Sequence, residues 1–80
     1  MNNRNSTKPQ IKIGTIVKFD KKYIARDISI IYDYKNLIGI VVDQKENHSV
    51  LVRWQGKGVY WRGSYLDQST HYVRDLELVQ

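Results

Sequence analysis

The chain has 80 residues, a formal net charge of +5, 41% hydrophobic residues and no cysteine. This length allows one small domain with a compact core, because a short chain buries only about 60% of the surface that it exposes when unfolded. The lack of cysteine excludes disulfides and thiolate metal sites. No apolar run approaches the roughly 18 residues of a membrane span, and the first six residues are too polar to begin a signal peptide. We therefore expect a soluble, cytoplasmic protein without a membrane partner.

Residues 1–10 are polar and contain almost no apolar side chain. They cannot bury enough apolar surface to offset the entropy of ordering, so we expect a disordered basic arm ahead of a domain at 11–80. Arg4, Lys8 and Lys12 make this end of the chain basic, and the remainder carries ten basic residues against eight acidic ones, a net charge of +2. Three charges predict only a weak attraction to nucleic acid.

Alternating apolar residues predict the first strand, with its main run at residues 15–19 and Gly14 at a bulge or tight turn. The long segment 20–36 breaks this pattern. Within it, residues 28–34 alternate again, which predicts an irregular strand or a long hairpin arm. The same segment mixes three tyrosines with three aspartates, a weak candidate for a polyproline-binding groove.

Consecutive branched residues at 37–43 predict a strand that is covered on both faces or wrapped round a barrel. A polar loop at 44–48 separates it from the next strand, in which Val50, Val52 and Trp54 share one face. Because side chains alternate along a strand, Arg53 is expected on the opposite face.

Glycines in residues 55–58 predict a tight turn, and residues 59–62 complete a hairpin. Regular alternation in that last strand puts Val59 and Trp61 on one side, so we expect Trp61 in the core. Tyr60 and Arg62 then face outward, and one of them is expected to share an outer face with Arg53.

The polar run 63–72 shows neither strand alternation nor a helical period, so a loop is predicted there. A single helical turn at 73–75, capped by a hydroxyl, and a closing strand at 76–79 follow. Five strands and no helix of useful length predict an all-β fold, a small five-stranded barrel or tightly bent sheet.

Segments 14–19, 39–42, 50–54 and 75–79 together resemble the small SH3-like barrel proteins of tailed bacteriophages. They resemble the KOW, Tudor and MIB/HERC2 barrels more distantly. The resemblance covers roughly residues 13–79 and implies an SH3-like barrel that binds peptides, RNA or neighbouring subunits. The scaffold alone does not choose among these ligands, because function resides in the site.

The chain contains two tryptophans, six tyrosines and one phenylalanine. Aromatic rings and guanidinium groups recur at protein interfaces and also stack on nucleic-acid bases. We expect a protein partner, a host factor or a virion subunit, with nucleic acid as the alternative. The alternative for the aromatic residues is that the tryptophans fill the core and the tyrosines cover its ends. The candidate contact residues are Arg53, Lys57, Tyr60, Arg62, Tyr65 and Arg74, together with the basic residues of the arm.

Catalysis is not expected, and neither is a cofactor, a metal or a small-molecule substrate. His48 and His71 lie in predicted loops without metal-binding spacing. Ser64, His71 and either Asp67 or Asp75 supply the residue types of a catalytic triad. The sequence contains no nucleophile elbow or oxyanion-hole motif to accompany them.

Overall fold

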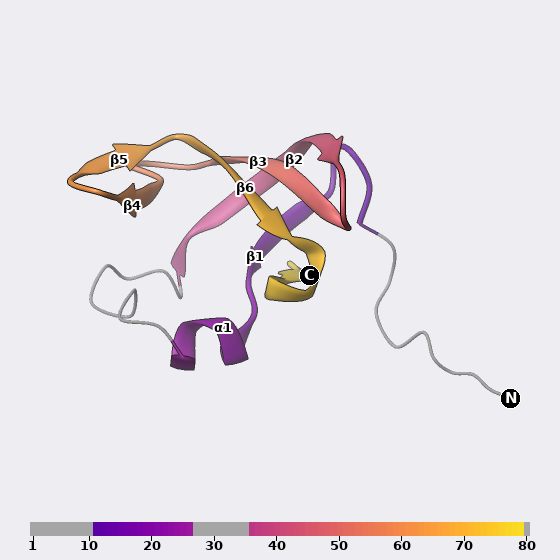
Figure 1. Cartoon of the computed structure of the whole chain (residues 1–80), viewed down its shortest axis with the longest axis horizontal. Coiled ribbons are helices and arrows are strands. Elements are labelled where there is room, and N and C mark those ends of the chain that lie inside the picture. The colour runs from indigo at the N-terminus through magenta and orange to yellow at the C-terminus, as the bar shows by residue number, and fades with distance from the viewer. Residues whose placement is uncertain (1–10, 27–35, 80) are drawn as a thin grey trace, which may run out of the picture.

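The computed structural model describes residues 11–26 and 36–79, with the backbone alone for residues 24–26 (Figure 1). The predictions for the arm at 1–10, including Arg4 and Lys8, and for a strand at 28–34 lie outside the described residues. The elements in chain order are β1 (Ile16–Phe19), α1 (Lys21–Arg26), β2 (Ile38–Lys45), β3 (Ser49–Trp54), β4 (Val59–Trp61), β5 (Ser64–Leu66), β6 (Gln68–Tyr72), the 3-10 turn η3 (Val73–Asp75) and β7 (Leu76–Leu78).

The prediction of a small all-β fold is confirmed. Five strands form an antiparallel sheet in the order β6-β3-β2-β1-β7, and β4 pairs with β5 in a separate two-stranded sheet. β6 and β7 lie at opposite edges of the larger sheet, although only η3 separates them along the chain. Because so few residues span at most about 14 Å, the sheet curls and brings its two edges close together. In the part of the chain that the structure describes, no ladder joins these two edges.

The core lies inside the curled sheet. Among the described residues, the buried apolar side chains that form it are Ile11, Val17, Phe19, Val41, Val50, Val52, Trp54, Val59 and Leu76. The Phe19 and Trp54 rings stack at a centroid distance of 4.8 Å. A Cβ on Gly39 would lie 2.7 Å from the Trp54 ring. Because glycine has no side chain, the Trp54 indole can pack directly against the backbone of β2.

A short helix follows β1 where the sequence predicted only a break. The Asp20 carboxylate accepts a hydrogen bond from the Lys22 amide at 2.8 Å and thereby caps α1. The helix is less than two turns long. It places Tyr23 against Phe19, with the rings stacked at 4.7 Å. The Tyr23 side chain, a member of the proposed polyproline groove, therefore covers the core, and most of that groove lies outside the described residues.

The prediction of a loop at 63–72 is wrong, because β5 and β6 occupy this stretch. The predicted hairpin between residues 50–54 and 59–62 is also wrong, because β3 pairs with β2 and β6 whereas β4 pairs with β5. β6, not β4, supplies the fifth strand of the larger sheet. The sequence pattern did not predict β6 because its inward-facing residues, Ser69 and His71, are polar. The predicted helical turn at 73–75 and the closing strand after it are confirmed. The predicted hydroxyl cap is wrong, because the N-cap residue is Tyr72 and its side chain makes no cap hydrogen bond.

Candidate binding surface

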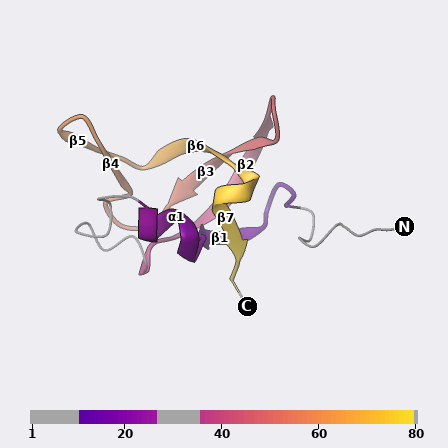
Figure 2. The same ribbon diagram turned by 60° about the horizontal axis from the view of Figure 1, so that its bottom comes forward.

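The β4–β5 hairpin stands at one end of the molecule, away from the C-terminus, in both views of the ribbon (Figures 1 and 2). Its turn consists of Arg62 and Gly63, which have positive φ angles of 50° and 88°. Two positive φ angles define the type I′ turn, whose twist matches that of paired strands. Tyr60 pairs with Tyr65 directly across the hairpin, so both side chains emerge from one face.

The base of this hairpin is held firmly against the larger sheet. The Trp54 amide donates a hydrogen bond to the Asp67 carbonyl at 2.7 Å, where the chain leaves β3 and returns to β6. Val59 is buried in the core. Gly58 has a φ of +84°, and a Cβ there would overlap the Leu66 carbonyl oxygen. The close approach of the two hairpin strands at this point therefore depends on glycine.

Aromatic rings and cations gather on the hairpin. The Tyr60 and Tyr65 rings meet edge to face at 5.2 Å. Lys57 Nζ lies 5.5 Å from the centre of the Tyr65 ring, and Arg62 Cζ lies 5.2 Å from that of Trp61. Cations over aromatic faces are attracted by the ring quadrupole. We call these five residues, 57, 60, 61, 62 and 65, the aromatic hairpin.

Trp61 corrects one prediction from the sequence. It was expected in the core, but its side chain is 58% exposed. Its register opposite Ser64 places it on the same side of the hairpin as buried Val59, as alternation requires. The hairpin extends past the end of the core, however, so only Val59 reaches the interior.

The other predicted contact residues lie elsewhere. Arg53 is exposed on β3, and its cross-strand neighbours are Ile40 and Gln68. Its pairing therefore lies in the larger sheet, whereas Tyr60 pairs within the hairpin. Arg74 lies in η3, beyond the far end of β6, with Cζ 4.9 Å from the centre of the Tyr72 ring. Lys12 is exposed ahead of β1.

A half-buried polar network against the core was not predicted. The Trp54 indole Nε1 donates a hydrogen bond to Ser69 Oγ at 2.8 Å, and Ser69 Oγ lies 2.6 Å from His71 Nε2. Burial lowers the pKa of His71 to about 4, and the Asp75 carboxylate opposes this shift. The Ser69 hydroxyl and the neutral imidazole therefore share a hydrogen bond, and the tautomer of His71 decides which of the two groups donates. The hydroxyl beside His71 is thus not that of Ser64, which lies in the hairpin.

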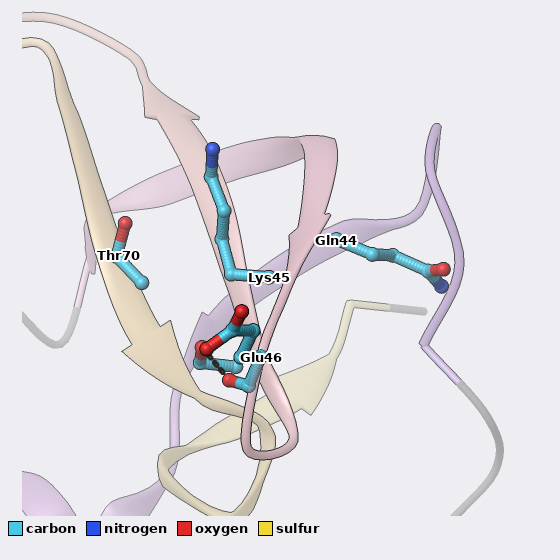
Figure 3. A pocket seen from close by; sticks show the side chains of 5 residues that line it. Gln44, Lys45, Glu46 and Thr70 are labelled. Carbon is cyan, nitrogen blue, oxygen red and sulfur yellow. Dashed lines mark hydrogen bonds between the residues drawn. The ribbon is translucent and has the colours of Figure 1, made fainter.

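A shallow depression of about 560 Å³ lies beside the β2–β3 turn, lined by Gln44, Lys45, Glu46, Ser49 and Thr70 (Figure 3). Lys45 Nζ is 3.2 Å from the Asp43 carboxylate, and Gln44 points away from Lys45. The side chains that line the depression therefore do not converge on one point where a ligand could bind. Among the described residues, no group of three or more histidine, aspartate or glutamate side chains is arranged to hold a metal ion.

Comparison with known proteins yields no match among protein-family models, curated proteins or solved structures. The resemblance to phage barrels therefore stays a prediction. No helix in the described ranges, 11–26 and 36–79, is long and apolar enough to cross a membrane.

Proposed function

We propose that this protein is a non-enzymatic binding module that contacts a partner protein through the aromatic hairpin. The observation that carries the proposal is the exposure of Trp61 and Tyr65, which are 58% and 45% accessible on a hairpin whose base is anchored in the core. Tryptophan, tyrosine and arginine dominate the binding energy of many protein interfaces. An anchored hairpin also loses little conformational entropy on binding.

The charge of the hairpin favours a protein over nucleic acid. Residues 55–67 contain two basic side chains, Lys57 and Arg62, and one acidic side chain, Asp67. Both cations lie over aromatic rings. Proteins that bind nucleic acid gain most of their affinity from neutralising several phosphates, and this hairpin offers few such contacts. In the setting that the resemblance to phage barrels implies, the partner is a host factor or a virion subunit.

Capture with matched variants tests the proposal. Tyr65 and Tyr72 are similarly exposed, at 45% and 48%, and each has a cation over its ring, but only Tyr65 is in the hairpin. We expect nuclease-treated lysate of the source cell to yield a partner that binds the wild-type and Tyr72→Ala chains equally. Trp61→Ala and Tyr65→Ala should each weaken the purified complex by at least about tenfold. Equal affinity for all four chains contradicts the proposal.

A nucleic-acid-binding accessory protein is the second candidate, because each cation and ring pair on the hairpin can also stack on a base. It predicts a different salt response. Arg62→Ala and Arg53→Ala should each reduce the slope of log affinity against log salt by about one phosphate contact. An affinity for DNA or RNA whose slope is unchanged in both variants excludes this arginine surface.

A further inference from the structure

β6 forms an edge of the five-stranded sheet in the part of the chain that the structure describes. It pairs with β3 along its whole length, from Gln68 opposite Arg53 to Tyr72 opposite Ser49. An edge strand presents a row of backbone N–H and C=O groups that can pair with another strand.

The hydrogen bonds at the two ends of β6 establish the direction of its backbone groups. The Asp67 carbonyl accepts from the Trp54 amide at 2.7 Å, and the Val73 amide donates to the His48 carbonyl at 2.8 Å. Both bonds point toward β3 and follow the register of the ladder. In an antiparallel pair, alternate residues point to the partner strand. Residues 69 and 71 therefore bond β3, whereas the N–H and C=O groups of residues 68, 70 and 72 point away from it.

We infer that β6 is the self-association edge of this protein and pairs antiparallel with β6 of a second copy, about a two-fold axis at Thr70. In this arrangement Thr70 pairs with its own counterpart, and Gln68 pairs with Tyr72 of the other copy. Each pair exchanges two N–H···O bonds through the outward-pointing groups. The contact uses the same strand in both copies, as closed two-fold dimers do.

Charge complementarity favours a second copy as the occupant. β6 itself contains no aspartate, glutamate, lysine or arginine, so its pairing brings no like charges together. Exposed Asp67 precedes the strand, and exposed Arg74 lies just beyond its other end. Antiparallel pairing sets Asp67 of one copy beside Val73 and Arg74 of the other, and it does so at both ends of the interface. Asp75 follows Arg74, but it is half-buried and its carboxylate acts on the inward-facing His71. The exposed charges that flank β6 are therefore acidic at one end and basic at the other, which makes the edge complementary to itself.

Hydrogen exchange combined with sedimentation tests this pairing on the full chain. Over protein concentrations from about 10 µM to about 1 mM, we expect the sedimenting mass to rise toward that of a dimer. The amides of residues 68, 70 and 72 should become protected over the same range, whereas those of residues 69 and 71 are protected throughout by β3. A monomer at every concentration, a larger assembly, or association without protection of these three amides overturns the inference.

Charge exchange identifies the interface without disturbing the strand. Asp67→Lys and Arg74→Glu should each weaken association by about tenfold or more, because each places like charges at both ends of the dimer. The double variant restores opposite charges and should return the association constant to within about threefold of the wild-type value. Thr70→Pro removes an outward N–H and should abolish association while the β3–β6 ladder remains. Failure of the double variant to recover association overturns the pairing.

Discussion

The Ser69 hydroxyl lies 2.6 Å from His71 Nε2 and accepts a hydrogen bond from the Trp54 indole at 2.8 Å. These three side chains form a polar network in which buried Trp54 meets the half-buried side chains of Ser69 and His71. His71 also meets the Phe19 ring edge to face at 4.9 Å, so the imidazole links β6 to β1 across the interior. Buried polar groups stabilise a fold only when their hydrogen bonds are satisfied. The core therefore depends on the protonation state of His71 and on the Ser69 hydroxyl.

Acid should destabilise the fold through His71. Its pKa is lowered from 6.5 to about 4 in the folded chain. Between these values the unfolded chain binds the proton and the folded chain does not. The contribution of neutral His71 to the free energy of unfolding is therefore fully present above pH 6.5 and is lost as the pH falls toward 4. We expect the free energy of unfolding to be about 2 kcal/mol lower at pH 5 than at pH 7 from this residue. Urea unfolding of the wild-type and His71→Phe chains at both pH values measures the effect.

His48 provides the matched control for the pH experiment. It is exposed in the β2–β3 turn at a φ of 59°, which asparagine also tolerates. His48→Asn should keep the wild-type difference in stability between pH 5 and pH 7, whereas His71→Phe should reduce it. The same difference in both variants would show that His71 is not the group responsible.

Removing the Ser69 hydroxyl should destabilise the core at neutral pH. Ser69→Ala leaves the Trp54 indole N–H and the His71 imidazole without this partner, and an unsatisfied buried polar group costs about 1–3 kcal/mol. Ser69→Thr keeps a hydroxyl and should retain more of the stability than alanine. Chemical unfolding followed by tryptophan fluorescence compares the three chains. An alanine variant as stable as wild type contradicts this role for the network.

Two glycines with positive φ should respond differently to alanine. Gly56 has a φ of +65° with open space around it, whereas a Cβ on Gly58 would overlap the Leu66 carbonyl. Gly56→Ala should cost about 1–2 kcal/mol from backbone strain alone. Gly58→Ala adds a clash with backbone atoms and should cost at least about 3 kcal/mol. Equal free energies of unfolding for the two variants would show that the base of the hairpin is not closely packed.

Replacing Arg62 with asparagine should stabilise the fold and weaken binding to the partner. It occupies the first position of a type I′ turn at a φ of 50°, where asparagine is favoured. Arg62→Asn should therefore raise the free energy of unfolding by about 0.5–1 kcal/mol. The same variant loses the guanidinium over the Trp61 ring and should bind the partner protein more weakly. A variant that is more stable and binds equally well would remove Arg62 from the contact surface.

The sequence predicted β1 and β3 because their apolar residues alternate, and β2 because it contains consecutive branched residues. Val50, Val52 and Trp54 were expected on one face of β3, and all three are buried. The strand at β6 was missed because its inward positions hold Ser69 and His71, whose burial depends on hydrogen bonds that no local pattern reveals. Local sequence also cannot show that this polar strand completes the larger sheet.

The candidate surface was predicted only in part. The structure brings Lys57, Tyr60, Arg62 and Tyr65 together through a turn at Arg62 and Gly63 that was not predicted. It places Arg53 and Arg74 away from them. Trp61 was excluded from the surface, although alternation predicted its side of the strand correctly. Alternation gives the direction of a side chain but not the point at which the core ends. That point depends on pairings between distant segments.

The role of the aromatic hairpin is tested most directly by amide-resolved NMR of the wild-type chain, titrated with the captured partner and with short DNA and RNA at low and near-physiological salt. We expect the partner to shift resonances of residues 57–66 most strongly, and nucleic acids to cause only diffuse shifts that salt abolishes. Partner-induced shifts concentrated on the larger sheet, or nucleic-acid shifts at the hairpin that persist at near-physiological salt, would contradict the account.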